Sequence, residues 1–231
     1  MEPGKGHLHP ISILIEESNA IFNELGFAVA TGPEIETERY NFDALNIPAH
    51  HPSRDMWDTF WLKPLEDRKL LRTHTSPVQI RYMETHTPPL RIISPGKVFR
   101  HEATDATHES QFYQLEGLMI DRNVSLAHLK AILEAYFRKI LSKDIIIRFR
   151  PSYFPFVEPG VEIDIEFQGK WLEVMGAGMV HPHALQAAGI HPGQWSGFAF
   201  GGGLDRLAML KYGIPDVRLL YNGDMRLINQ F

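Results

Sequence analysis

The sequence contains no cysteine and no long apolar run. The first absence excludes disulfides and thiolate metal sites, and it favours a reducing compartment such as the cytoplasm. No segment approaches the roughly 18 apolar residues that a membrane-spanning helix needs, and the start "MEPGKGHLHP" lacks the apolar region of a secretory signal. Positive charge is also in short supply: the formal net charge is -5, which gives no general attraction for nucleic acid. A soluble cytoplasmic protein without membrane contact is expected.

Phosphate-loop motifs are absent as well, although three consecutive glycines occur in "SGFAFGGGLDRLAML". The stretch matches neither the Walker motif G-x-x-x-x-G-K-[ST] nor the dinucleotide fingerprint G-x-G-x-x-G. We expect a strand over 198–200, a glycine turn over 201–203 and a helix over 204–212 that ends at Gly213. Two interpretations stay open: a tight turn beside a surface arginine, or a turn without side chains over which Arg206 reaches a flat ligand.

The 231 residues, 44% of them hydrophobic, are enough for one large globular domain. Apolar residues recur at helical spacing over 11–27 and 125–141, and Ser125 is a suitable N-cap for the second helix. Short β-branched or aromatic segments dominate the second half, and in "VEIDIEF" the acidic side chains alternate with apolar ones. Because the elements do not alternate in βαβ order, we predict an α+β fold with a mostly antiparallel sheet.

A long hairpin is predicted from strands over 92–100 and 112–120, joined by a polar loop, with Arg100 and Glu102 at its lip. The planar guanidinium suits a carboxylate or a phosphate, and a carboxylate two residues on shares the same strand face and could hold an amino group. The pair could therefore grip an activated acid. An ordinary cross-strand ion pair on an exposed hairpin is the other interpretation.

Three short motifs resemble, in order, the signature motifs of class II aminoacyl-tRNA synthetases: "GPEIE", "FRHE" and "GGGLDR". Longer stretches, among them "RFRPSYFPFVEPGVEIDI" and "WLEVMGAGMVHP", resemble the catalytic module of bacterial-type phenylalanyl-tRNA synthetase alpha subunits. The resemblance covers nearly the whole chain. It implies one class II catalytic domain over 1–231, with motif 1 at about 11–38, motif 2 at about 92–120 and motif 3 at about 197–212.

The resemblance implies an antiparallel sheet flanked by helices and a two-step reaction. Phenylalanine and ATP give phenylalanyl-adenylate, and the acyl group then passes to tRNA(Phe). It also implies Mg²⁺ as cofactor and a larger beta subunit as partner in an (αβ)2 assembly. The match begins almost at residue 1, so the N-terminal coiled-coil arm of the family, which reaches the tRNA, is expected to be missing. Without the beta subunit, the first helix and the "GPEIE" strand would expose apolar area and favour a self-dimer.

Two arginines match catalytic positions of the family. Arg100 matches the motif 2 arginine that binds the ATP α-phosphate and the amino-acid carboxylate, and Arg206 matches the motif 3 arginine that stacks over adenine. Attack of a carboxylate on the α-phosphorus brings anions together, and a fixed guanidinium lowers that repulsion. The implied ATP-binding positions are Arg100, Glu102, His108, Phe112, Gly203 and Arg206.

The implied phenylalanine-binding positions combine polar acceptors with aromatic rings. Acceptors suit an α-ammonium group, aromatic side chains suit a benzyl ring, and Ala199 would set the depth of the pocket. Without the resemblance, "YFPF" is also explained by core packing. The positions are His74, Ser76, Gln114, Glu116, Phe154, Phe156, Ala199 and Gly201.

Glu158 matches a magnesium position of the family, and a surface carboxylate before a turn is the alternative interpretation. The histidines in "HEATDATH" and at His181 and His183 lack the spacing of a helical zinc motif, which argues against zinc. One departure concerns Gly202, a position more often hydrophobic in the family, where glycine is expected to loosen the turn. A catalytically weak paralogue with a regulatory or assembly role, and a class II enzyme of another specificity, are the alternative functions.

Overall fold

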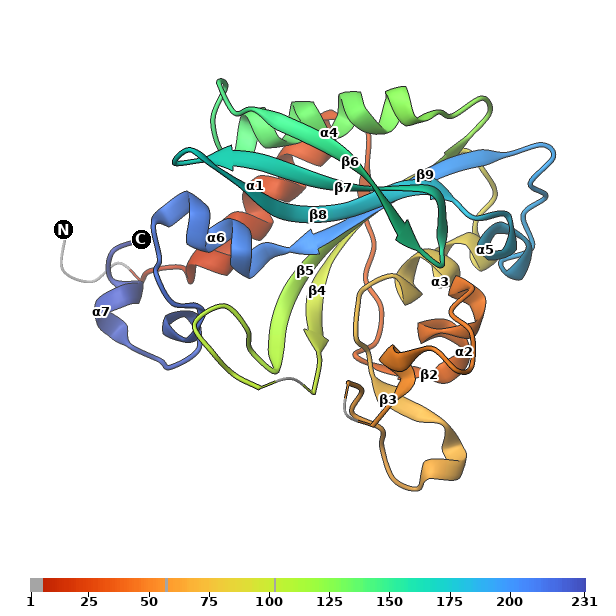
Figure 1. Cartoon of the computed structure of the whole chain (residues 1–231), viewed down its shortest axis with the longest axis horizontal. Coiled ribbons are helices and arrows are strands. Elements are labelled where there is room, and N and C mark those ends of the chain that lie inside the picture. Colours follow the sequence, from red (N-terminus) through yellow and green to blue (C-terminus); the bar gives the residue numbers. More distant parts are fainter. Residues whose placement is uncertain (1–5, 57, 102) are drawn as a thin grey trace.

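A computed structural model describes residues 6–56, 58–101 and 103–231, so the predicted site residue Glu102 lies outside the described residues. The main sheet contains β1 (Ala28–Val29), β4 (Leu90–Phe99), β5 (Gln111–Asp121), β6 (Ile147–Phe154), β7 (Val157–Phe167), β8 (Lys170–Val180) and β9 (Ser196–Gly203). The strand order is β1-β4-β5-β9-β8-β7-β6 (Figure 1). Only β1 runs parallel to its neighbour, β4; the other pairs are antiparallel. The predicted α+β class and antiparallel sheet are confirmed.

The helices and a small second sheet surround these strands (Figure 1). The helices are α1 (Pro10–Glu24), α2 (Glu38–Asn41), α3 (Pro77–Thr85), α4 (Leu126–Ile140), α5 (Pro182–Ala187), α6 (Leu204–Tyr212) and α7 (Met225–Ile228). Strands β2 (Ile35–Thr37) and β3 (Lys69–Leu71) pair with each other in the second sheet. Among the described residues, no helix is long and apolar enough to cross a membrane.

The two long helices begin and end where local chemistry favours it. The His9 ring caps α1 by accepting a hydrogen bond from the backbone N–H of Ile11, at 3.2 Å. Gly26, just beyond α1, has a φ of 82°, a left-handed conformation that glycine adopts without steric cost. At the start of α4, the Ser125 N–H and hydroxyl lie 3.1 and 2.9 Å from Nδ1 of His128. Both predicted helices are confirmed.

The main sheet separates two apolar clusters. On the side of α1 and α4, the ring of Phe22 stacks on Tyr136 at 4.7 Å and on Phe200 at 5.4 Å between ring centroids. Pairs of this kind add about 0.5–1.5 kcal/mol beyond area burial. The second cluster lies on the other side of the sheet and contains Phe42, Ile80 and Ala199. Because side chains alternate along a strand, one face of β9 packs into the first cluster and the other face is left more open.

Helix α3 is the main element that the sequence patterns did not predict. Pro77 occupies its first turn, where the missing N–H and the fixed φ of proline are tolerated. Its buried face includes Val78, Ile80 and Met83, and packs into the second cluster. The segment just before α3 and the first turn of α3 thereby come to lie against the open face of the main sheet.

The three glycines are part of a strand, so the predicted glycine turn at 201–203 is wrong. They pair with β5 in regular register, Gly202 opposite Leu115, and α6 begins directly at Leu204. Gly202 is buried, and a Cβ on it would lie 2.4 Å from the carbonyl oxygen of Val174. Glycine at this position lets β8 and β9 approach closely instead of loosening a turn.

The acidic face of "VEIDIEF" is less exposed than simple alternation predicts. Asp164 on β7 is almost fully buried. Arg148 and Arg150 on the neighbouring edge strand β6 both bind it, with closest N–O distances of 2.6 and 2.5 Å. These hydrogen bonds hold the pKa of Asp164 below its ordinary value. The two guanidinium groups thus compensate for burial of the carboxylate.

We expect Gly202→Ala to lower the free energy of unfolding by roughly 1–3 kcal/mol, because its methyl group must displace a backbone carbonyl. Gly203→Ala is the matched control, since a Cβ there meets nothing within 4 Å. Urea denaturation of both variants measures the difference. Equal stability of the two variants would contradict the close approach of β8 and β9.

Candidate active site

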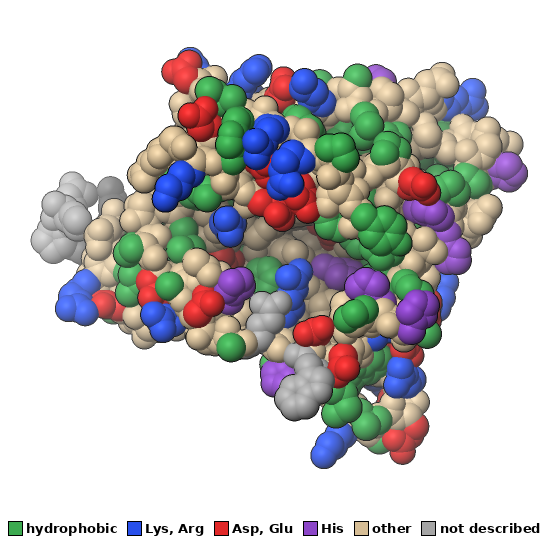
Figure 2. Space-filling model, in the orientation of Figure 1, with side chains coloured by type: hydrophobic (Ala, Val, Ile, Leu, Met, Phe, Trp, Pro, Cys, Tyr) green, Lys and Arg blue, Asp and Glu red, His purple; other side chains and the backbone are tan. Residues whose placement is uncertain are grey.

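A cavity of about 790 Å³ opens on the face of the sheet that carries Ala199. Its floor comes from β5, β8 and β9, and its sides come from the segment before α3 and from the chain around the β6–β7 turn. Figure 2 shows its mouth as a hollow near the middle of the molecular face, with histidine side chains along one side. The volume falls in the range typical of small-molecule sites.

The floor of the cavity is made of very small residues. Residues Ala199, Gly201 and Gly203 alternate along β9 and therefore point to the same face. A Cβ on Gly201 would lie 2.9 Å from Oε1 of Glu116, so only glycine leaves that carboxyl in place. The absence of side chains here lets a ligand lie flat against the strand.

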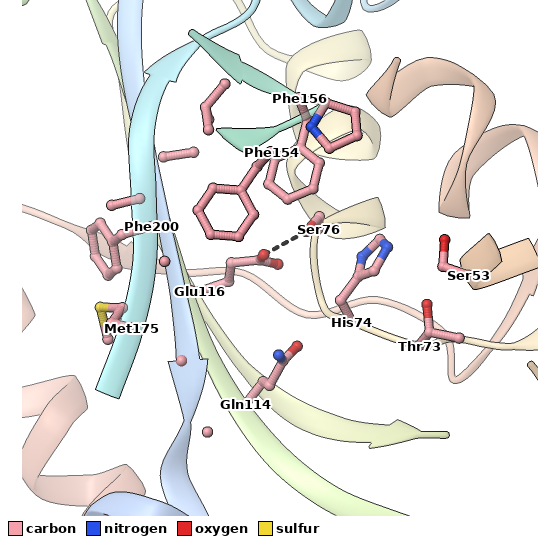
Figure 3. Close-up of a pocket in the computed structure, with 18 of the residues that line it drawn as sticks. Ser53, Thr73, His74, Ser76, Gln114, Glu116, Phe154, Phe156, Met175 and Phe200 are labelled. Carbon is pink, nitrogen blue, oxygen red and sulfur yellow. Dashed lines mark hydrogen bonds between the residues drawn. The ribbon is translucent and has the colours of Figure 1, made fainter. Parts of the chain in front are cut away.

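Polar groups meet at one end of the cavity. The hydroxyl of Ser76 donates a hydrogen bond to Oε1 of Glu116, drawn as a dashed line in Figure 3. The backbone N–H of Thr75 donates to the Gln114 side chain at 3.3 Å. Within the described residues, Oε2 of Glu116 and both ring nitrogens of His74 are buried without a hydrogen-bond partner. Unpartnered buried polar atoms are costly, so this end of the cavity is prepared for a polar ligand.

Burial controls the protonation of this end. It raises the pKa of Glu116 to about 7, although the hydroxyls of Ser76 and Thr75 and the charges of Arg72 and Arg100 act in the opposite direction. Burial also lowers the pKa of His74 to about 3, so its ring is neutral near pH 7. This end of the cavity therefore contains one carboxyl that ionises near neutrality, Glu116, and one imidazole that does not, His74.

Aromatic rings line the wall beside this polar end. Phe154 and Phe156 stack with centroids 6.0 Å apart, and the His74 ring lies 6.4 Å from that of Phe156. The ring of Phe154 rests on Gly176, where a Cβ would come within 2.8 Å of it. Figure 3 shows both phenylalanines beside Glu116, within the same cavity. An apolar slot thus lies next to a carboxyl.

A second part of the cavity has a different character. Its residues include Arg100 and Phe112, and the Arg100 guanidinium lies 5.0 Å from the centroid of the Phe112 ring. Nε of Arg100 donates to the carbonyl of Thr73 at 3.2 Å. Arg206 projects from the first turn of α6, and Glu173 from β8 also lines this part. Cationic and flat apolar groups together suit a planar anion.

Asp205 anchors the start of α6 beside Arg206. Its carboxylate accepts hydrogen bonds from the backbone N–H of Tyr113, at 2.7 Å, and from the hydroxyl of Tyr221. Burial raises its pKa to about 6. The aspartate of "GGGLDR" is thus a structural link between α6, β5 and the C-terminal segment.

The structure brings most of the predicted site residues together, and it leaves two outside the cavity. His108 lies on the exposed loop between β4 and β5, 3.0 Å from Asp105. Glu158 lies on β7 with a side chain 77% exposed. The predicted residues that line the cavity are His74, Ser76, Arg100, Phe112, Gln114, Glu116, Phe154, Phe156, Ala199, Gly201, Gly203 and Arg206.

Some lining residues were not predicted. Thr73 lies in the segment before α3 and Gln79 in the first turn of α3, and a helix start at "SP" is the signal that could have placed Gln79. Others come from β8, where "EVMGAG" alternates without an obvious chemical motif. The unpredicted lining residues are Ile47, His51, Ser53, Asp58, Thr73, Gln79, Tyr153, Pro155, Val157, Glu173, Val174, Met175, Gly176, Ala177, Phe200 and Gly202.

The donor set does not form a magnesium cage. Glu158 lies 3.5 Å from Nε2 of His181, and no group of three metal-binding side chains occurs in the described part of the chain. Mg²⁺ in nucleotide sites is commonly bound by one or two carboxylates together with substrate phosphates, so the side chains present would hold it only alongside a bound nucleotide.

Comparison with known proteins identifies close relatives. The family described as "tRNA synthetases class II core domain (F)" matches residues 2–231. The chain is 52% identical over 227 residues to the phenylalanine–tRNA ligase alpha subunit of Synechocystis sp., covering 98% of this chain and 68% of that protein. It is 53% identical over 227 residues to the alpha subunit of Edwardsiella ictaluri, with the same coverage.

The fold is also found in a solved structure. The crystal structure of pyrrolysyl-tRNA synthetase from Desulfitobacterium hafniense matches with a TM-score of 0.72, over 92% of this chain and 73% of that one. The sequence identity is 21%, so this likeness concerns the fold alone. The sheet and its flanking helices are those of a class II synthetase core.

We expect Glu116→Gln to stabilise the free protein at pH 8 by up to about 3 kcal/mol, because it removes a buried charge. The folded chain raises the pKa of this carboxyl, so its contribution to stability is complete below about pH 4.5 and is lost as the pH rises through about 7. Denaturant unfolding at pH 4.5 and pH 8 tests this. The variant's advantage should vanish at pH 4.5, and the exposed control Glu66→Gln should show no such difference. An advantage at both pH values would refute the assignment.

Proposed function

The chain belongs to the phenylalanine–tRNA ligase alpha-subunit family of class II tRNA synthetases, and from this we propose how its cavity performs that ligase activity. Phenylalanine and ATP react to give phenylalanyl-adenylate and pyrophosphate, and the acyl group then passes to tRNA(Phe). The proposal rests on one observation. In a single cavity, the buried carboxyl of Glu116, with one oxygen that lacks a hydrogen-bond partner in the described structure, lies beside the rings of Phe154 and Phe156.

The amino acid occupies the end of the cavity near Glu116. Its α-ammonium group binds the ionised Glu116 carboxylate, whose Oε2 has no partner in the described structure, and the amide oxygen of Gln114. Its benzyl ring enters the slot beside Phe154 and Phe156, where aromatic contacts favour it. The small side chain of Ala199 leaves room for the far edge of the ring. Charge and shape thus select an aromatic amino acid.

The nucleotide occupies the part of the cavity that carries the two arginines. Arg100 binds the α-phosphate and the amino-acid carboxylate, and Phe112 and Arg206 bind the adenine on its two faces, with Gly203 beneath. A carboxylate oxygen attacks the α-phosphorus, and the bond to the leaving pyrophosphate breaks. The guanidinium of Arg100 lowers the repulsion between the reacting anions and stabilises the transition-state charge. No general base is needed, because the nucleophile is already ionised.

The guanidinium of Arg100 lies 5.0 Å from the centroid of the Phe112 ring in the structure. Its hydrogen bond to the Thr73 carbonyl keeps it close to the amino-acid end. The roles of His108 and Glu102 in contacting the nucleotide stay predictions.

The remaining parts of the proposal concern partners. Mg²⁺ accompanies the ATP phosphates, and none of the roles assigned to this chain's side chains depends on it. A ligand role for Glu158 stays a prediction. We propose that 1–231 acts as one catalytic domain in the cytoplasm with a beta subunit, as (αβ)2, and that the exposed Val29 and Ile35 belong to the association surface that would otherwise support a self-dimer.

We expect the chain, purified with its beta subunit, to catalyse phenylalanine-dependent exchange of pyrophosphate into ATP. Arg100→Ala should lower the rate by at least about 100-fold, because it removes the donor at the reacting phosphate. Arg226→Ala, whose side chain is 91% exposed on α7, is the control and should retain the wild-type rate. Exchange that depends equally on serine or histidine, or that survives the Arg100 change, would disprove the assignment.

We expect Ala199→Gly to raise kcat/KM for para-substituted phenylalanines by about tenfold or more, since one methyl group fewer deepens the slot. Competition assays between phenylalanine and para-chlorophenylalanine measure this ratio. Ala30→Gly, at a buried position outside the cavity, provides the comparison and should leave the ratio unchanged. An unchanged ratio in Ala199→Gly would remove this residue from the specificity pocket.

A further inference from the structure

Arg72 is a buried cation that joins three segments around the cavity. The residue is only 4% exposed. Its Nε donates to the carbonyl of Lys97 on β4 at 2.7 Å, and its Nη1 donates to the carbonyl of Gly32 at 3.1 Å. Its backbone N–H donates to the backbone carbonyl of Glu34, and its own carbonyl accepts from the backbone N–H of Phe99, both at 2.9 Å. One residue therefore ties the segment around 32–34 to β4 and to the chain that leads into the site.

Strand β4 leaves space for this guanidinium. A Cβ on Gly96 would lie 2.3 Å from Nη2 of Arg72 and 3.2 Å from its Cζ. Gly96 pairs with Gln114 on β5, two residues before Glu116. The guanidinium thus packs against Gly96 on β4, beside the strand that supplies the polar end of the cavity.

The charge of Arg72 is not neutralised in place. Its hydrogen bonds go to carbonyl groups, and the described residues place no carboxylate within salt-bridge distance of it. Three acidic side chains interact electrostatically with Arg72: Glu34, Glu36 and Glu116. Glu36 is paired with Arg81 at 2.7 Å, and Glu34 is exposed. Glu116 is the remaining one, and it is buried. The charges of Arg72 and Glu116 each favour the ionised form of the other.

The other groups around Glu116 do not replace this effect. Arg100 is the second cation that favours its ionised form. His74 at the same end is neutral. Ser76 and Thr75, just before α3, and Gly201 on β9 carry no charge, although the two hydroxyls also favour the ionised form of Glu116. Because Arg100 is assigned to the reacting phosphate, Arg72 is the cation whose position does not depend on the nucleotide.

We propose that Arg72 is a positioning residue for the amino-acid site: its fixed charge favours the ionised form of Glu116, and its hydrogen bonds hold residues 73–76 against β4. This inference rests on the proposed function, in which ionised Glu116 binds the α-ammonium group. Arg72 itself touches neither substrate. The backbone link from Arg72 leads directly to Thr73, which accepts from Arg100, and on to Ser76, which donates to Glu116.

The test follows the KM for phenylalanine between pH 6.5 and pH 9 in the exchange assay, with KM for ATP measured in parallel. In Arg72→Gln we expect KM for phenylalanine to rise about fivefold or more at pH 7, since a Glu116 pKa one unit higher leaves about one fifth as much carboxylate. The increase should disappear toward pH 9, where the carboxyl ionises anyway. The KM for ATP should change less than twofold.

Two further variants separate charge from shape and keep the test usable if Arg72→Gln does not fold. Arg72→Lys keeps the positive charge but loses the planar guanidinium. Its KM for phenylalanine should therefore depend on pH as in the wild type, while its kcat is lower. Gly96→Ala displaces the guanidinium without removing it and should shift the pH profile in the same direction as Arg72→Gln. Arg81→Gln, which removes a cation bound to Glu36, is the matched control and should leave the pH profile unchanged.

A direct readout distinguishes failure of this inference from failure of the proposed function. Carbon-13 NMR of glutamate-labelled protein follows the titration of the Glu116 carboxyl without substrate. A titration midpoint that rises in Arg72→Gln and not in Arg81→Gln supports the inference, even if phenylalanine-dependent exchange is absent. An unchanged midpoint, or KM values for phenylalanine and ATP that rise together at every pH, would overturn it.

Discussion

The burial of the Glu116 carboxyl is the constraint on which the rest of the cavity depends. Moving a carboxylate out of water is costly unless hydrogen bonds and opposite charges compensate for it. Here the compensation is incomplete: Ser76 donates to one oxygen, while the other has no partner among the described residues. The guanidinium groups of Arg72 and Arg100 add to this compensation through space, and burial still raises the pKa of Glu116 to about 7. The carboxyl is therefore held near its ionisation point, which leaves it free to gain strongly from a bound cation.

Glu116 keeps its position because the sheet behind it cannot slip. A shift of one residue between β5 and β9 would exchange the faces of every side chain. The small residues Ala199 and Gly201 would then enter the core, and Phe200 would fill the cavity. The stacking of Phe200 on Phe22 and of Phe22 on Tyr136 opposes such a shift. The aromatic core on one face of the sheet thus fixes the register of the open face.

The sequence predicted the elements whose patterns are strongly periodic, and it predicted the cavity mostly through resemblance to a known family. The helices over 10–24 and 126–140 and the hairpin of β4 and β5 follow from apolar spacing and caps. Without the resemblance, "YFPF" could not be told from core packing, because aromatic residues line cores and pockets alike. The stacked geometry of Phe154 and Phe156 over a glycine depends on contacts between distant strands.

The errors have a common physical cause, which is that local propensity competes with tertiary pairing. Consecutive glycines favour turns, yet here hydrogen bonds to β5 and the close approach of β8 hold Gly202 in a strand. Helix α3 has a weak apolar pattern because its first turn serves the cavity and only part of its surface serves the core. Arg72 carries no motif at all: its importance arises from Gly96, Lys97 and Gly32, which meet it only after folding.

Stability and binding are in conflict at the polar end of the cavity, and the fold resolves the conflict by separating them in space. Unpartnered atoms of Glu116 and His74 weaken the free protein, since buried polar groups without partners cost about 1–3 kcal/mol each. The opposite face of the sheet supplies the compensating aromatic core, which no ligand enters. Both faces belong to the same strands. Substitutions that fill the cavity floor therefore reduce ligand binding more than stability, whereas substitutions at Gly202 or Phe200 disturb the pairing register of β5 and β9, on which both the core and the cavity depend.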